Sequence, residues 1–208
     1  MPWPEHRSER HTECACCCFP RLIFVEPIVK RPSFLKRVYL KHFAKPASER
    51  VLFSAIASQS VRQIVEIGIG DCSRAQRLLR LAVQCHGGPI TYCGVDLFEA
   101  APKGRPILKY KDAYCKLNAA NCKTKLVPGE PTAALASCAN SFTNTDLILI
   151  GNQFDSTALA SMWMYVPRML TAQTLLFQQS HDGGFSLVTH RRIQALADQA
   201  TELRRKAA

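Results

Sequence analysis

The sequence predicts an α/β protein built on a doubly wound, parallel β-sheet. Five short apolar segments alternate with segments of helical periodicity, the pattern of strand–helix–strand units joined by right-handed crossovers. The first apolar segment, within residues 62–70, ends in a Gly-x-Gly turn and passes at once into a helical pattern. A buried strand that breaks into a glycine turn and re-enters as a helix typically opens a nucleotide-binding sheet.

The chain before the sheet divides into two parts. Residues 1–30 sustain neither a helical nor a strand period, so we expect a disordered or loosely packed tail there. Residues 31–60 are expected to form a helical extension. It consists of one helix over 34–43 and a second over 47–59.

The first of these helices has clear start and stop signals. The Ser33 hydroxyl is placed to cap its free N–H groups, and Pro46 ends it. Leu35, Val38 and Tyr39, with His42 or Phe43, share one apolar face, while the basic residues lie elsewhere on the helix.

Residues 61–208 are expected to form the sheet domain. Strands are expected at residues 63–67, 90–95, 123–127, 146–150 and 174–178. Helices are expected at residues 73–85, 108–118, 132–141, 156–169 and 187–205. The expected strand order is 3-2-1-4-5, and ligands are then expected beyond the carboxyl ends of the strands, at the switch point between strands one and four.

The length and charge of the chain limit which partners are possible. The chain has 208 residues, 47% of them hydrophobic, which suits one folded domain with a sizeable core. No apolar run is long enough to cross a bilayer, so no membrane is expected among the partners. The net charge of +11 suits an anionic partner such as nucleic acid, but no nucleic-acid-binding motif accompanies it. The oligomeric state is left open.

The ten cysteines fall into two groups. Six are scattered through the apparent core, where cysteine behaves as a small apolar residue, so reduced thiols and a cytoplasmic location are expected. The other four lie at positions 14, 16, 17 and 18, near His6 and His11. They could supply a zinc site, but their spacing matches no known finger, so no metal site is expected.

Acidic residues and glycines follow the first three strands. Glu66 stands within the first strand, and Gly68 and Gly70 form the turn after it. Asp96 ends the second strand, and Glu130 follows the third. Glycine lets the backbone lie flat against a ligand, and a strand-end carboxylate can accept two hydrogen bonds from ribose hydroxyls.

These segments resemble motifs of the class I S-adenosylmethionine-dependent methyltransferases, whose fold is Rossmann-like. The matching segments are Val-Glu-Ile-Gly-Ile-Gly, Gly-Val-Asp-Leu-Phe-Glu and Val-Pro-Gly-Glu. The resemblance implies S-adenosyl-L-methionine as cofactor, with Gly68 and Gly70 against its methionine part and Glu66 helping to hold its ammonium. It also implies that Asp96 binds the ribose and that Glu130 approaches the adenine amino group.

The segment after the fourth strand departs from the family. Metal-dependent members need a carboxylate there, but this chain has Gly151-Asn152-Gln153, and Asp155 could substitute only if the loop curled back. No catalytic residue is therefore assigned. His181 and Asp182, after strand five, are the nearest candidates for a general base, although a polar loop is the commoner role of such residues.

Three functions remain open from the sequence. The first is a methyltransferase acting on an unknown small-molecule substrate. The second is a catalytically inactive binding or interaction module on the same fold, which the missing acid after strand four favours. The third is a nicotinamide-dependent oxidoreductase, disfavoured because Ser73 stands where the dinucleotide turn has its third glycine.

Overall fold

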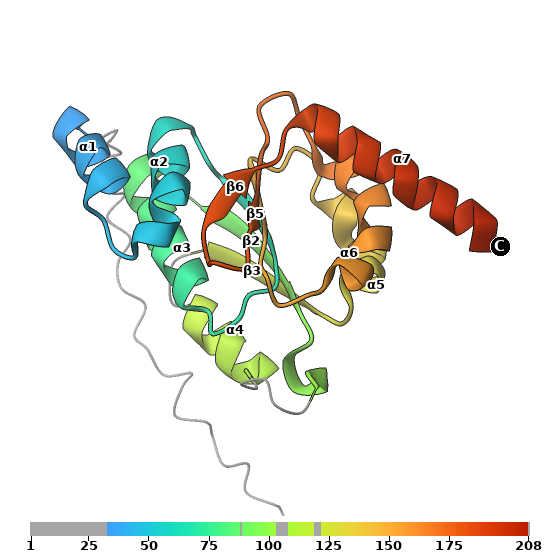
Figure 1. The fold of residues 1–208 in the computed structure, drawn as a ribbon. Coiled ribbons are helices and arrows are strands. Elements are labelled where there is room, and N and C mark those ends of the chain that lie inside the picture. The colour runs from blue at the N-terminus through green and yellow to red at the C-terminus, as the bar shows by residue number, and fades with distance from the viewer. Residues whose placement is uncertain (1–32, 88, 103–107, 119–121, 208) are drawn as a thin grey trace, which may run out of the picture.

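A computed structural model describes residues 33–87, 89–102, 108–118 and 122–207. Its centre is a six-stranded sheet of order β3-β2-β1-β4-β5-β6, with helices on both faces (Figure 1). The strands are β1 (Gln63–Ile67), β2 (Ile90–Asp96), β3 (Cys122–Pro128), β4 (Leu147–Ile150), β5 (Leu175–Gln179) and β6 (Phe185–Leu187). The first five pair in parallel, which confirms the expected doubly wound sheet and its strand order.

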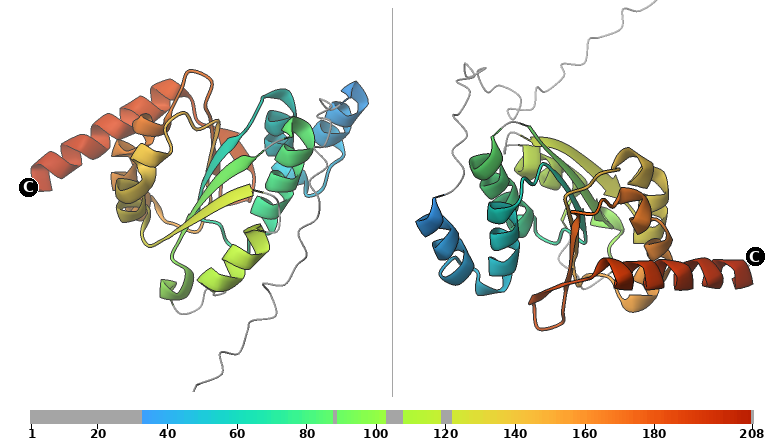
Figure 2. Two further views of the ribbon diagram at one scale, coloured as in Figure 1. Left: turned by 180° about the vertical axis from the view of Figure 1, so that it is seen from behind. Right: turned by 90° about the horizontal axis from the view of Figure 1, so that it is seen from above.

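The helices form two layers, which are seen from two further sides in Figure 2. One face carries α2 (Arg50–Ser58), α3 (Ser73–His86) and α4 (Tyr110–Asn118), and α1 (Phe34–His42) packs outside α2. The other face carries α5 (Pro131–Cys138), α6 (Ser156–Ala160) and α7 (His190–Ala207). The tail expected over residues 1–30, with its possible zinc ligands, lies outside the described residues.

Buried strands direct alternate side chains into two separate cores. In β4, Leu147 and Leu149 join the core beneath α2 and α3, while Ile148 and Ile150 join the core beneath α5 and α7. All four are fully buried. Burial on both faces explains why the sequence reads as continuous apolar runs rather than as an alternation.

Two expectations about the C-terminal third were wrong. The single helix expected over residues 156–169 is α6 followed by 3₁₀ turns at Ser161–Met164 and Val166–Met169. Pro167 lies in the second turn, where it lacks the N–H that a continuous α-helix would need. The last helix begins at His190 instead of residue 187, because Phe185–Leu187 forms the antiparallel strand β6 against β5.

The described cysteines are free thiols, as expected; five are buried, and only Cys115 is exposed. Burial, together with the nearby Glu66 carboxylate, raises the pKa of the Cys72 thiol to about 12. Such a thiol stays protonated at neutral pH and acts as a small apolar group. Among the described residues, no helix is both long and apolar enough to cross a bilayer.

Candidate ligand site at the carboxyl edge of the sheet

The turn after β1 requires glycine at two positions. Gly68 has a φ of 83° and Gly70 a φ of 68°, both in the left-handed region that side chains disfavour. The Gly68 N–H donates to the Val95 carbonyl at 2.8 Å, so the turn begins beside the end of β2. Cys72 follows at a φ of 68° and is the N-cap residue of α3.

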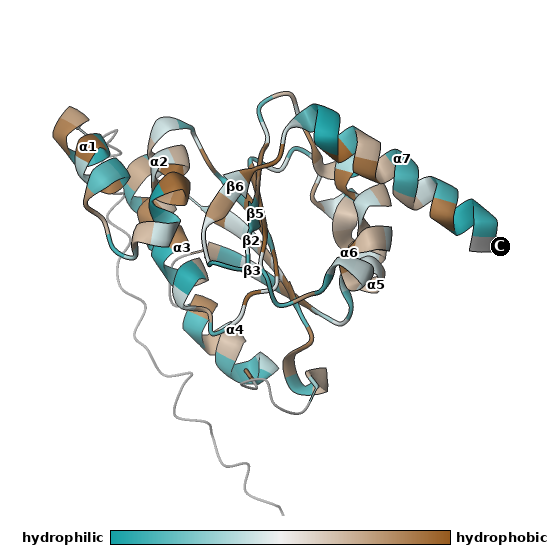
Figure 3. Cartoon of the chain, in the orientation of Figure 1, coloured by the Kyte–Doolittle hydropathy of each residue, from teal (hydrophilic) through white to brown (hydrophobic). Residues whose placement is uncertain are grey.

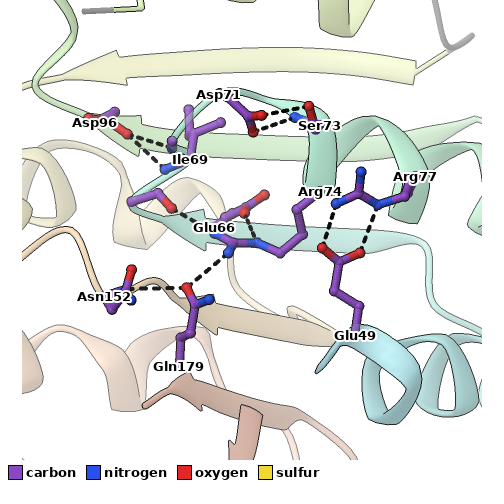
Figure 4. Close-up of polar contacts among 12 residues, drawn as sticks. Glu49, Glu66, Ile69, Asp71, Ser73, Arg74, Arg77, Asp96, Asn152 and Gln179 are labelled. Carbon is purple, nitrogen blue, oxygen red and sulfur yellow. Dashed lines mark hydrogen bonds and ion pairs between the residues drawn. The ribbon is translucent and has the colours of Figure 1, made fainter. Parts of the chain in front are cut away.

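Asp96 holds this turn in place. Its Oδ2 accepts hydrogen bonds from the Ile69 N–H at 2.8 Å and the Gly70 N–H at 3.1 Å (Figure 4). Its Oδ1 accepts from the Leu97 N–H at 2.7 Å. A carboxylate has about four acceptor sites, so three backbone donors leave room for one further donor. Asp96 therefore positions the glycine turn in addition to facing the edge where a ligand is expected.

Glu130 lies one strand further along the same edge. Asp96 pairs with Pro128 across β2 and β3, and the Gly129 N–H donates to the Asp96 carbonyl at 2.9 Å. Glu130 follows as the N-cap residue of α5; its side chain is exposed and makes no capping hydrogen bond. The structure thus brings Gly68, Asp96 and Glu130 to the ends of three adjacent strands.

Glu66 lies below this edge in a buried ion pair. Its Oε1 accepts from the Arg74 Nε at 2.7 Å, and its Oε2 accepts from the Tyr92 hydroxyl at 2.7 Å. The Glu66 side chain is 0% exposed and that of Arg74 is 10% exposed. Because the Glu66 side chain is fully buried, it reaches a ligand ammonium only if one of these partners moves.

Arg74 links the elements around the glycine turn. Besides Glu66, it donates to the Gly68 carbonyl at 2.8 Å and to Gln179 Oε1 of β5 at 3.0 Å (Figure 4). Burial opposes the charged guanidinium, but the Glu66 carboxylate outweighs this and raises the pKa of Arg74. Burial and the same carboxylate raise the pKa of the Tyr92 hydroxyl well above its ordinary value. The network therefore holds the Arg74 guanidinium and the Tyr92 hydroxyl in place as donors to Glu66.

Arg74 was not among the site residues predicted from the sequence. The signal for it was faint: a basic residue stands in the first turn of α3, where the helix dipole favours an acidic one. Such a residue implies a nearby carboxylate that compensates its charge.

Gln153 fills the space over the glycines. A Cβ atom added to Gly68 would lie 2.3 Å from Gln153 Oε1, and one added to Gly70 would lie 2.7 Å from its Nε2. A Cβ on Gly151 would lie 2.2 Å from the same Oε1 and 2.6 Å from the Gly68 carbonyl oxygen. The three glycines form a cradle, defined by Gly68, Gly70 and Gly151, that holds a flat polar group.

The Gln153 amide is not fully satisfied in that cradle. Its Oε1 is buried and has no hydrogen-bond partner among the described residues. An unpaired buried acceptor costs free energy, so its place favours a donor such as an ammonium or a hydroxyl group. The cradle therefore fits a polar ligand group that displaces Gln153 or approaches its oxygen.

The other candidates after strands four and five have structural roles. Asp155 caps α6 by accepting from the Ala158 N–H at 2.7 Å, so it does not curl back towards the edge. The exposed Asp182 carboxylate accepts from the Ser180 hydroxyl and from the Gly184 N–H within the β5–β6 turn. Hydrogen bonding from Ser180 lowers the pKa of Asp182, which makes it a weaker base. His181 is exposed in the same turn.

A cavity of about 550 Å³ lies elsewhere, between α6, β6 and α7. It is lined by Trp163, Leu187, Arg192 and neighbouring residues, and by none of Gly68, Asp96 and Glu130. The site described above is thus defined by convergent backbone and carboxylate groups rather than by a deep apolar pocket.

Comparison with known proteins gives no family assignment. The sequence matches no protein-family model, and no curated protein is significantly similar to it. Solved structures that it resembles include an S-adenosylmethionine-dependent methyltransferase from Thiobacillus denitrificans in complex with S-adenosyl-L-homocysteine (TM-score 0.41, 15% identity, 71% of this chain and 54% of that chain). A second, from Geobacter sulfurreducens and with the same ligand, gives a TM-score of 0.41 at 12% identity over 73% of this chain and 56% of that chain.

A third is precorrin-6y C5,15-methyltransferase from Geobacter metallireducens, with a TM-score of 0.44 at 17% identity over 78% of this chain and 71% of that chain. The chain spans about half the length of the first two. Likeness at this level establishes neither family membership nor a shared ligand. The class that the structure itself defines is a doubly wound α/β protein with a glycine turn and two acidic residues at its carboxyl edge.

Proposed function

We propose that this chain is an S-adenosylmethionine-dependent methyltransferase that acts on a small molecule. The observation that carries the proposal is the meeting of the Gly68 turn, Asp96 and Glu130 at one edge, beside a cradle of three glycines. In open α/β sheets, ligands bind in this place, outside the carboxyl ends of the strands. The motif resemblance supplies the identity of the cofactor.

Each residue then has a definite task towards the cofactor. Asp96 would use its remaining acceptor capacity for the ribose, and the exposed Glu130 carboxylate would accept from the adenine amino group. The cradle would hold the amino-acid end once Gln153 has moved aside. Glu66 would act on that end through Arg74, which bonds to the Gly68 carbonyl.

For methyl transfer, the protein has mainly to align the methyl acceptor with the methyl group of the cofactor. When bound, the cofactor supplies a methyl group that its sulfonium already activates, so the protein contributes positioning and exclusion of water. No described residue is assigned as a general base, which suits an acceptor that loses its proton readily.

Calorimetric titration tests the proposal directly. We expect saturable binding of S-adenosylmethionine and S-adenosylhomocysteine and none of NAD. Saturable binding of NAD alone would support the oxidoreductase instead. If none of the three compounds binds, the glycine turn has no role in binding this class of ligand.

A non-catalytic module on the same fold is the second candidate. It is favoured by Gln153, which occupies the cradle, and by the lack of a carboxylate in Gly151-Asn152-Gln153 after β4. Binding of S-adenosylmethionine without turnover on a broad panel of hydroxyl, amine and thiol acceptors would support this candidate over the enzyme.

Replacing Gln153 with alanine is expected to strengthen cofactor binding, because the ligand no longer has to displace a side chain. The gain is about tenfold if the cradle is open in about a tenth of wild-type molecules. Titration of both proteins measures it. Asn152→Ala is the matched control, since the neighbouring Asn152 side chain is exposed and, of the groups of Asn152, only the backbone N–H bonds to a described residue. Weaker binding by Gln153→Ala would instead make Gln153 a ligand contact.

Two glycine variants separate crowding in the cradle from backbone strain. Gly68 and Gly183 have φ values of 83° and 86°, but a Cβ on Gly183 meets no atom within 4 Å. Gly183→Ala is therefore expected to cost about 1–2 kcal/mol of stability from strain alone. Gly68→Ala is expected to cost more, because its Cβ meets Gln153. Urea denaturation measures both, and Gln153→Ala in the Gly68→Ala protein should remove most of the excess. Equal costs would show that Gln153 does not press on the turn.

A further inference from the structure

The apolar face of α1 points away from the protein. Phe34 is 77% exposed, Leu35 78%, Tyr39 56% and Phe43 64%. The side chain that anchors α1 to α2 is Leu40, which is buried. Figure 3 shows α1 with both hydrophobic and hydrophilic residues at the periphery of the molecule, beyond α2. A surface helix usually shows the opposite arrangement, with its apolar stripe towards the core.

The exposed apolar residues form one continuous surface. At about 100° per residue, Phe34, Val38, Leu35, Tyr39 and Phe43 fall within roughly half of the helix circumference. We call this surface the outward face of α1. Large exposed apolar patches on a protein generally mark a place of contact with another surface.

Basic residues flank the outward face on both sides. On the same helical wheel Lys36 borders one side, Arg37 and Lys41 border the other, and Lys45 follows the helix. All four are exposed, and none forms an ion pair with a described residue. No acidic residue occurs between Glu26 and Glu49, and Glu49 is itself buried in an ion pair with Arg77. The whole surface is thus largely apolar at its centre, where the exposed His42 also lies, and cationic at its rim.

We propose that the outward face of α1 docks on the surface of a lipid bilayer that contains anionic lipids. An apolar helix face flanked by lysine and arginine inserts at the boundary of headgroups and acyl chains, while its cations remain among anionic headgroups. Such a helix lies on the bilayer and does not span it. The expectation of no membrane partner was drawn from the lack of a spanning segment, which this mode of binding does not need.

Charge argues against two other occupants of this face. A second copy of the chain, packed face to face, would bring the same cations together, since a twofold contact joins like surfaces. The chain's own residues 1–32 carry five basic and four acidic residues, so they offer no net negative charge. An anionic bilayer matches both the apolar centre and the cationic rim.

Flotation of the full chain with vesicles tests the proposal. We expect binding to vesicles of phosphatidylcholine with about a quarter phosphatidylserine, weakened by added salt, and no binding to phosphatidylcholine alone. Combined replacement of Lys36, Arg37 and Lys41 by glutamine is expected to weaken binding by about 100-fold, because each cation near an anionic surface contributes roughly fivefold. The matched control replaces Arg204, Arg205 and Lys206, which removes the same charge from the end of α7 and should leave binding nearly unchanged.

A second pair of variants tests the apolar centre. Phe34→Ser with Phe43→Ser should abolish flotation, whereas Leu187→Ser with Leu203→Ser should not, although those leucines are 53% and 48% exposed. Circular dichroism checks that each variant is folded. Equal binding by the α1 variants and their controls would overturn the proposal. A dimer in sedimentation velocity that Phe34→Ser with Phe43→Ser dissociates would assign the face to a second copy instead.

Discussion

Arg74→Met is expected to lower the free energy of unfolding by about 3–5 kcal/mol, the usual cost of removing one partner from a buried ion pair. The variant leaves the fully buried Glu66 carboxylate without its cation, and it also removes the donors to the Gly68 carbonyl and Gln179. Urea denaturation measures the change. Arg80→Met is the matched control, because Arg80 lies on the same helix with an exposed side chain.

A second substitution separates the effect of the unpaired buried charge from that of lost packing. Adding Glu66→Gln to Arg74→Met should restore most of the stability, since the buried charge is then gone. A loss that the second substitution does not reduce would mean that Arg74 acts mainly by filling space.

Asp96→Ala is expected to weaken S-adenosylmethionine binding at least tenfold. A charge-assisted hydrogen bond contributes about 1.5–3 kcal/mol, and a factor of ten corresponds to about 1.4 kcal/mol. The fold should survive with a lower unfolding midpoint, because the Ile69, Gly70 and Leu97 N–H groups lose their acceptor. Calorimetric titration and urea denaturation measure the two effects.

Asp71→Ala provides the control for Asp96. Asp71 is a carboxylate in the same turn, but it is exposed, and among the described residues its hydrogen bonds go only to Ser73. Removing it changes the local charge equally and should leave affinity within about threefold, as expected for an exposed charge. If Asp96→Ala leaves the affinity for S-adenosylmethionine unchanged, Asp96 is not part of the site. If Asp96→Ala and Asp71→Ala lose equal affinity, Asp96 contributes only through its charge.

Most of the sheet could be predicted from sequence because its strands are buried on both faces. Residues 63–67 form β1 as expected, and the other four parallel strands differ from expectation by one residue at one end or at both. β6 was missed because its three residues are too few to show a period and two of them are exposed. The orientation of α1 was also beyond prediction, since periodicity reveals an apolar face but not what lies against it.

The candidate site was predictable only in part, for a related reason. Strand order places Gly68, Asp96 and Glu130 on neighbouring strand ends, so local patterns were sufficient for them. Arg74 and Gln153 act through contacts between distant parts of the chain: Arg74 bonds to Gln179, 105 residues away. No local pattern encodes such a contact, and the polar groups that surround the glycine turn therefore emerge only from the folded chain.

The pairing of β1, β2 and β3 makes the carboxyl edge selective for the length of a ligand. Adjacent strands lie about 4.8 Å apart, so the ends that carry Gly68 and Glu130 are separated by roughly 10 Å, with Asp96 midway. A single sugar or amino acid can contact two of these three residues, whereas an elongated molecule such as a nucleoside with a side chain can contact all three. Truncated fragments of the cofactor should accordingly lose affinity in steps, one for each strand end that they fail to reach.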